Sequence, residues 1–307
     1  MNDIKENRVF YSIKTAVKEP DAVEVLDLHF KSLESIPEEV FTFHNLKELI
    51  LWNNEIEELP ADIAKLTKLE KLELSGNLIE KIPAEIKNLQ NLKVLVISWN
   101  NLKTLPDEIG ELTNLERLGL SNNHLESLPD TIGNLSKLTE LVVSENNLMA
   151  IPTTISKLTQ LEKLRIPGNF LSKLPNEICD LPNLVKLEIH ENNLIELPEN
   201  IGKLKSLQKF RAYKNILETL PESFCELTEL KKALMYENEL TTLPANLGEL
   251  TNLEELRLGY NYLKTLPESI SNLKNLKKLS LTRNEFDNGE KERIKSLFGP
   301  QVIEWEG

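Results

Sequence analysis

The chain has 307 residues, with 36 lysines and arginines against 49 aspartates and glutamates, which gives a net charge of −13 at pH 7. This acidic balance argues against wholesale binding to nucleic acid or membrane surfaces, although a local basic patch could override it. The N-terminus lacks the apolar core of a signal peptide, and no apolar run reaches membrane-spanning length. We therefore expect a cytoplasmic protein, or one exported without a recognisable signal peptide, that does not bind membranes.

The chain begins with a segment, residues 7–18, whose apolar positions include Phe10, Ile13 and Ala16. Their spacing predicts a short amphipathic helix. A repeated array follows it, and the first repeat of such an array would otherwise expose its leucines. We therefore interpret residues 1–22 as an N-terminal helical cap.

Residues 23–286 consist of twelve frames with a period of 23 residues and no insertion or deletion. A proline recurs at this step from Pro37 to Pro267, and an asparagine recurs from Asn54 to Asn284. Leucines and isoleucines recur with them. A fixed period of this length predicts a curved solenoid, in which each repeat buries its apolar side chains against the next one.

Each frame predicts one strand followed by one helical turn. Within residues 112–134, Leu118 and Leu120 are separated by one outward residue, as in a strand with one buried face. Pro129 with Asp130 behind it fits the first position of a helix, where proline is tolerated and an acid complements the helix dipole. The recurring asparagine is expected to hydrogen bond to backbone groups of adjacent turns.

The frame LTNLERLGLSNNHLESLPDTIGN (residues 112–134) resembles the leucine-rich repeat superfamily, in the 23-residue subclass whose repeats end in L-P-x-x-I. That subclass includes bacterial leucine-rich repeat proteins and intracellular scaffolds that bind small GTPases. The resemblance covers residues 23–286. It implies an α/β horseshoe with a parallel β-sheet on the concave face and short helices or 3-10 turns on the convex face. It leaves open a host-directed bacterial effector, a bacterial housekeeping scaffold or a eukaryotic signalling adaptor.

One repeat departs from the leucine pattern. Phe210 and Ala212 replace its two central strand leucines, and the next repeat has Ala233 and Met235 at the same positions. The large Phe210 is therefore expected beside the small Ala233, and the small Ala212 beside the large Met235. We interpret this exchange as conservation of core volume.

The repeat frame ends after Phe286. Residues 287–307 predict a turn, a helix, a Gly-Pro stop and a final short strand with Val302, Ile303 and Trp305. We interpret them as a C-terminal cap, so the whole chain is expected to form one continuous domain.

The residue types that carry catalysis are few and far apart. Cys179 and Cys225 occupy equivalent positions two repeats apart, about 10 Å at strand spacing, which is too far for a disulfide. His29 and His190, the two histidines expected on the concave face, are seven repeats apart. Phosphate loops, catalytic triads and metal-ligand clusters are not recognisable. We therefore predict no enzymatic activity, no cofactor and no metal.

The outward positions around each strand differ between the two halves of the array. In the first six repeats they hold two bases and five acids, together with exposed apolar residues that include Trp52 and Trp99. In the last six repeats they hold ten bases and four acids, a net charge of +6, with interleaved tyrosines. Tyrosine, tryptophan and arginine dominate interface hot spots. The predicted partner-binding residues are Arg165, His190, Lys209, Arg211, Tyr213, Lys214, Tyr236, Arg257, Tyr260, Trp52 and Trp99.

The function that this pattern favours is a non-enzymatic protein-protein interaction module. It would bind a partner protein of unknown identity on its concave face, through the basic, tyrosine-bearing C-terminal half. The partner is expected to be acidic, and the chain is expected to be a monomer. The alternative is a binder of a polyanion or small ligand, such as single-stranded nucleic acid or an acidic polysaccharide. The negative total charge disfavours nucleic acid.

Overall fold

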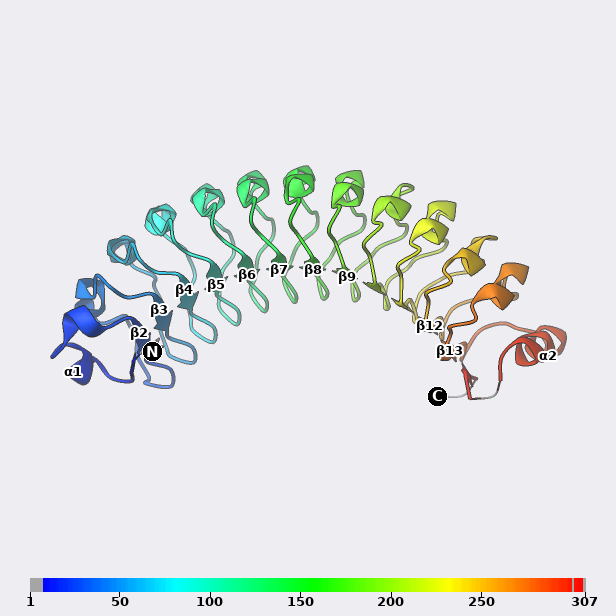
Figure 1. Ribbon diagram of the computed structural model, residues 1–307, viewed down its shortest axis with the longest axis horizontal. Helices are drawn as coiled ribbons and strands as arrows, with labels where there is room; N and C mark the ends of the chain where they lie inside the picture. Colours follow the sequence, from blue (N-terminus) through cyan, green and yellow to red (C-terminus); the bar gives the residue numbers. More distant parts are fainter. Residues whose placement is uncertain (1–7, 300, 306–307) are drawn as a thin grey trace, which may run out of the picture. The chain divides into compact units, whose positions relative to one another are not determined.

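The computed structural model describes residues 8–299 and 301–305. The chain divides into two compact units between Asn147 and Leu148. Within each unit, a parallel β-sheet lies along one side and short 3-10 helices lie along the opposite side (Figure 1). Each unit therefore has the solenoid architecture that the repeat predicted.

The first unit is a stack of parallel strands. Its described residues form strands β1 (Val9–Phe10), β2 (Val25–Asp27), β3 (Glu48–Ile50), β4 (Lys71–Glu73), β5 (Val94–Val96), β6 (Arg117–Gly119) and β7 (Glu140–Val142). They also form helix α1 (Ile13–Ala16) and the 3-10 helices η1 (Pro20–Ala22), η2 (Glu38–Thr42), η3 (Ala61–Lys65), η4 (Ala84–Asn88), η5 (Asp107–Glu111) and η6 (Asp130–Asn134). The strands lie in sequence order in the sheet.

The second unit repeats this plan. Its described residues form strands β8 (Lys163–Arg165), β9 (Lys186–Glu188), β10 (Lys209–Arg211), β11 (Lys232–Leu234), β12 (Glu255–Arg257), β13 (Lys278–Ser280) and β14 (Ile303–Glu304). They also form helix α2 (Asn288–Leu297) and the 3-10 helices η7 (Thr153–Lys157), η8 (Asn176–Asp180), η9 (Ile201–Lys203), η10 (Glu222–Glu226), η11 (Leu247–Glu249) and η12 (Glu268–Asn272). These strands also follow sequence order.

The constant period places equivalent residues side by side. Leu118 of β6 lies opposite Leu95 of β5 and Leu141 of β7, and all three side chains are fully buried. Because the register is constant from β2 to β7 and from β8 to β13, each outward residue of these strands has the equivalent residue of the next repeat as its neighbour, about 4.8 Å away. The functional face can therefore be read as columns that run across the strands.

The recurring asparagine plays the role predicted for it. The Nδ2 group of Asn123 donates to the carbonyl oxygens of Ile97 at 2.8 Å and Leu120 at 3.0 Å, and its Oδ1 accepts from the amide of Leu102 at 3.0 Å. The side chain is almost completely buried. It satisfies backbone groups in the turns between strands, which have no partner in the sheet.

A second set of asparagines, which the sequence reading missed, ties the opposite side of the repeats together. Asn91 donates to the carbonyl of Thr67 at 2.8 Å, and Asn114 donates to the carbonyl of Gln90 at 2.7 Å. The same 24-residue contact recurs at Asn183, Asn252 and Asn275. This second set could have been predicted from the sequence, because Asn91 and Asn114 are separated by one 23-residue period.

The N-terminal segment differs from the predicted helix. Of the described residues in 7–18, Val9 and Phe10 form β1, which pairs with β2; residue 7 lies outside the described residues. The helix is confined to Ile13–Ala16, with Ser12 as its capping residue. The prediction was wrong over its first half because the open edge of β2 offers backbone partners, and pairing with it also buries the Phe10 side chain.

The repeated proline lies one residue earlier than predicted. Pro129 precedes η6 as its capping residue, with φ −68° and ψ 149°. The proline ring fixes this φ, and the extended ψ turns the chain into the 3-10 helix. Asp130 is then the first helical residue.

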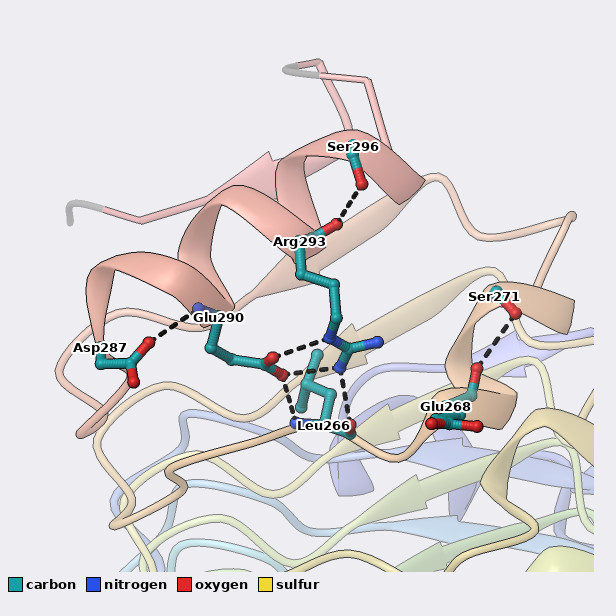
Figure 2. Close-up of polar contacts among 7 residues, drawn as sticks. All are labelled: Leu266, Glu268, Ser271, Asp287, Glu290, Arg293 and Ser296. Atoms are coloured by element: carbon teal, nitrogen blue, oxygen red, sulfur yellow. Dashed lines mark hydrogen bonds and ion pairs between the residues drawn. The ribbon is translucent and has the colours of Figure 1, made fainter.

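The C-terminal segment has the predicted turn and helix, and its final strand is limited to Ile303–Glu304, without Val302 and Trp305. Residue 300, in the predicted Gly-Pro stop, lies outside the described residues. Asp287 caps α2 by accepting from the amide of Glu290 at 2.8 Å. Glu290 and Arg293 then bind the turn before η12: Glu290 accepts from the amide of Leu266 at 2.7 Å, and Arg293 donates to the Leu266 carbonyl at 2.7 Å (Figure 2). Two side chains thus satisfy both backbone groups of one residue.

The four exchanged residues lie in the core, in the register expected from the period. Phe210 lies opposite Ala233 in the register, and Phe210, Ala212, Ala233 and Met235 are all fully buried. The structure adds a third participant. The ring of Phe224 meets Phe210 edge to face, with centroids 5.5 Å apart.

Candidate partner-binding surface

We define the strand face of each unit as the outward side chains of its strands together with two turn residues per repeat. These two residues follow the buried leucine that comes directly after each strand, as Ser121 and Asn122 follow Leu120. On the second unit, this face carries a row of four lysines on neighbouring strands in register. They are Lys163, Lys186, Lys209 and Lys232. Like charges directly opposite each other destabilise a sheet. The row therefore costs stability unless counter-charges lie beside or over it.

One counter-charge comes from Glu188, whose carboxylate is only 1% exposed. Arg165 contacts its Oε2 at 2.7 Å, while Lys186 and Arg211 contact its Oε1 at 3.0 and 2.9 Å. Three bases from three adjacent strands thus converge on one acid. Burial alone raises the pKa of the Glu188 carboxyl, but hydrogen bonds from Lys186 and Arg165 outweigh it and hold the pKa below its ordinary value.

Glu188 also positions the two arginines. Arg165 reaches it from β8 and Arg211 from β10, and their side chains remain 39% and 40% exposed. A guanidinium has five N–H donors, so each arginine keeps donors for an external acceptor. The outward positions of β8–β11 hold six bases, and Glu188 is the one acid among them.

An aromatic ladder lies beside these charges. The rings of His190 and Tyr213 stack with centroids 4.1 Å apart and an interplanar angle of 22°, and Tyr213 stacks on Tyr236 at 4.4 Å and 7°. The column ends at Gly259, where a side chain would collide with Thr282. Burial lowers the pKa of His190 and raises the pKa of Tyr213 to about 12. The ladder is therefore largely uncharged at neutral pH.

The structure brings seven of the predicted residues together on repeats of the second unit. These are Arg165, His190, Lys209, Arg211, Tyr213, Lys214 and Tyr236. Lys209 makes no ion pair within the described residues, whereas Lys214 pairs with Glu191 at 3.0 Å. Arg257, on the next strand, is held by Glu255 at 2.6 Å, and Tyr260 projects from the same repeat.

The two predicted tryptophans belong to the first unit and lie in different surroundings. Trp52 is partly exposed and contacts two rings: it stacks on His29 at 4.7 Å and meets Phe30 edge to face at 4.6 Å. Trp99, two strands away, is 65% exposed and makes no ring contact within the described residues. Two strand spacings are about 10 Å, so they form separate contact points.

One column of the strand face has an unusual backbone. In all twelve repeats, the second residue of the turn after the strand lies in the left-handed region. These residues are Phe30, Asn53, Gly76, Trp99, Asn122, Glu145, Gly168, Glu191, Lys214, Glu237, Tyr260 and Arg283. Glycine and asparagine adopt this conformation easily, whereas a bulky side chain is strained there. At Phe30, Trp99 and Tyr260, an aromatic residue therefore adopts a backbone conformation that costs conformational free energy.

Replacing Trp99 with glycine is expected to raise the free energy of unfolding by about 0.5 kcal/mol. Relief of the left-handed strain, about 1 kcal/mol, exceeds the entropic cost of the glycine. Trp99→Val should act in the opposite direction, because a β-branched residue fits this region worst. Urea unfolding of the two variants checks the order, and a glycine variant less stable than the valine variant would contradict it.

The cysteines are free and buried, as predicted. Burial raises the pKa of the Cys179 thiol to about 11 and that of the Cys225 thiol to about 12. A thiol with such a pKa has almost no thiolate at pH 8, and the thiolate is the reactive form. We expect Ellman's reagent to label neither thiol in the native protein at pH 8 and to label both in denaturant. Rapid labelling of the native protein would refute this expectation.

No helix among the described residues is long and apolar enough to cross a membrane.

Two family models match the chain. The model described as leucine-rich repeat region matches residues 15–118 and 175–301, and the model described as leucine rich repeat matches residues 113–171. No curated protein sequence matches the chain.

Several solved structures are similar to this chain. The Arabidopsis receptor kinase HAESA, solved with the peptide hormone IDA and the co-receptor SERK1, is 34% identical, over 86% of this chain and 47% of that chain, with a TM-score of 0.73. A TDR receptor is 29% identical, over 91% of this chain and 51% of that chain, with a TM-score of 0.80. A leucine-rich repeat protein of Leptospira interrogans is 30% identical, over 97% of this chain and 100% of that chain, with a TM-score of 0.47.

The chain spans about half the length of the two receptor chains. The matched family models together cover most of its residues, and each unit has a strand-and-turn repeat architecture. The chain belongs to the leucine-rich repeat family.

Proposed function

We propose that this chain is a non-enzymatic interaction module that binds an acidic partner protein on the strand face of its second unit. Leucine-rich repeat proteins commonly mediate protein-protein interactions, and HAESA was solved in complex with a peptide hormone and a co-receptor. The observation that carries the proposal is the charge of β8–β11. Six bases and one acid occupy their outward positions in a chain whose net charge is −13.

The aromatic ladder supports a protein partner. A purely electrostatic surface needs no rings, yet His190, Tyr213 and Tyr236 are stacked directly beside the bases. Rigid, partly exposed tyrosines lose little conformational entropy on binding and are common hot-spot residues. We therefore assign electrostatic steering to the lysines and arginines, and most of the affinity to Tyr213, Tyr236 and the arginines.

The test is capture of partners from native cell lysate, followed by affinity measurements with the purified partner. Arg211→Glu/Tyr213→Ala is expected to weaken binding at least tenfold, about the effect of losing one hot spot and reversing one charge. Trp52→Ala/Trp99→Ala tests the first unit in the same way. A matched control is Lys205→Glu, because Lys205 lies in the turn after η9, away from the strand face. If Arg211→Glu/Tyr213→Ala does not weaken capture of any partner, the strand face of the second unit is not the binding surface.

The second candidate is a polyanion binder, favoured by the row of lysines beside stacked rings. Nucleic-acid binding releases counterions and falls steeply with salt, so a salt titration with single-stranded oligonucleotides and with an acidic polysaccharide distinguishes the two functions. Measurable, salt-sensitive binding that Lys209→Ala and Lys163→Ala weaken supports this candidate. Absence of binding at low salt eliminates it.

A further inference from the structure

We propose that the first unit carries a second site, the aromatic corner formed by Phe30 and Trp52, which takes a cationic side chain such as a guanidinium or an alkylammonium group. This site prefers the charge opposite to that preferred by the lysine row of the second unit. It does not depend on the acidic-partner site, because it consists of different residues in a different unit.

The rings of the corner are already arranged. Phe30 and Trp52 meet with centroids 4.6 Å apart and an interplanar angle of 69°, so they form two walls at a steep angle. His29 stacks flat on Trp52 with an interplanar angle of 3° and supports it from the side. The faces of aromatic rings carry negative potential, which attracts cations within about 6 Å of the centroid.

The charges around the corner also favour a cation. The outward positions of β2–β4 include Asp27, Glu48, Lys71 and Glu73, three acids and one base. Lys71 lies 3.9 Å from Glu48, which leaves the other two acids without a lysine or arginine partner among the described residues. Asp27 instead accepts from the Nδ1 of His29 at 2.5 Å. This contact makes the carboxylate part of the wall that supports Trp52.

The Phe30 ring is exposed at a position where burial does not hold it. Phe30 has φ 51° and its side chain is 62% exposed, so the ring gains little from burial in a conformation that disfavours it. Gly76 and Gly168 occupy the equivalent position in other repeats. All twelve repeats adopt this backbone, so what distinguishes Phe30 is the exposed aromatic ring at a position that most other repeats fill with glycine, asparagine or a charged residue. The ring type and the acids specify the chemistry of the ligand.

The test is a titration followed by NMR of the ¹⁵N-labelled protein, read at the indole N–H signal of Trp52, which a Trp52→Phe variant assigns. The probes are Nα-acetyl-arginine amide and tetramethylammonium chloride, with Nα-acetyl-glutamate amide at equal ionic strength as the anionic comparison. We expect a saturable shift with both cations and none with the glutamate probe. No saturable shift with either cation, or an equal response to the glutamate probe, overturns the proposal.

Two variants make the result specific. Phe30→Gly removes one wall and relieves the left-handed strain, so the variant should remain folded while its affinity for the cations falls about fivefold. Asp27→Asn should lower the affinity as well, because it removes a carboxylate. Asn122→Gly, at the equivalent left-handed position of another repeat, should leave the titration unchanged. An unchanged affinity in folded Phe30→Gly overturns the proposal. Since the readout is Trp52, either outcome leaves the acidic-partner site of the second unit to its own test.

Discussion

Glu188→Gln is expected to lower the free energy of unfolding of the second unit by about 2 kcal/mol. The glutamine is nearly isosteric, but it removes the one acid that, among the described residues, forms ion pairs with Arg165, Lys186 and Arg211. Breaking a fully buried ion pair costs about 3–5 kcal/mol, and the half-exposed arginines recover part of this by contact with water. Urea unfolding, together with hydrogen exchange of the β9 and β10 amides, measures the loss.

The effect should depend on pH. The pKa of Glu188 is lower in the folded protein than in the unfolded chain, so the carboxylate contributes its full stability above the unfolded value of about 4.3. That contribution disappears as the pH falls through the folded pKa. The difference between wild type and Glu188→Gln should therefore be largest at neutral pH and should shrink in acid. A difference that is constant from pH 7 to strong acid would exclude the ion cluster as its cause.

The matched control for Glu188 is Glu191→Gln. Glu191 pairs with Lys214 at 3.0 Å, but both side chains are well exposed. Exposed pairs contribute about 0–1 kcal/mol, so this variant should be nearly neutral. Equal losses in the two glutamine variants would mean that burial of Glu188 confers no special role.

Arg293→Met is expected to destabilise the C-terminal end of the second unit by about 2 kcal/mol. Methionine keeps an apolar stem but loses the donor to the Leu266 carbonyl and both contacts with Glu290, whose side chain is only 10% exposed (Figure 2). Hydrogen bonds to charged groups contribute about 1.5–3 kcal/mol when a partner is left buried. Hydrogen exchange of the α2 and β13 amides should accelerate before the rest of the unit opens.

Lys295→Met is the control for Arg293. Lys295 lies in the same helix and pairs with Glu292 at 2.8 Å, but both side chains are exposed. Its loss should change stability by less than about 0.5 kcal/mol. If the two variants behave alike, Glu290 and Arg293 do not anchor the helix, and the assignment of residues 287–307 as a cap loses its main support.

Much of the candidate site could be predicted by writing the repeats in register. His190, Tyr213 and Tyr236 are spaced by 23 residues, so the ladder was implicit in the period. The left-handed column was also implicit, because glycine and asparagine recur there at Gly76, Asn122 and Gly168. Neither pattern requires knowledge of side-chain conformation, because the exact repeat places equivalent residues on adjacent strands.

The role of Glu188 could not be predicted in the same way. By position it is one outward acid among four in the last six repeats. Its burial depends on Arg165 and Arg211, which reach it from the strands on either side, and on the rotamer of Lys186, which directs the ammonium group toward it. Long side chains have many rotamers of similar energy, and only the packed neighbours select among them. For the same reason, sequence could not show that Trp52 packs against His29 and Phe30 while Trp99 stands apart.

By itself, the sequence determined the strand-and-turn repeat, the register, the buried asparagines and the position of Phe210 opposite Ala233. These follow from a period without insertions, which forces each repeat to meet an equivalent surface of the next. Only the tertiary structure decided which charges pair, which rings stack and that β1 pairs with the open edge of β2 instead of extending a helix. Those outcomes depend on contacts between side chains or backbone edges that are far apart in the chain, whose energies no local pattern records.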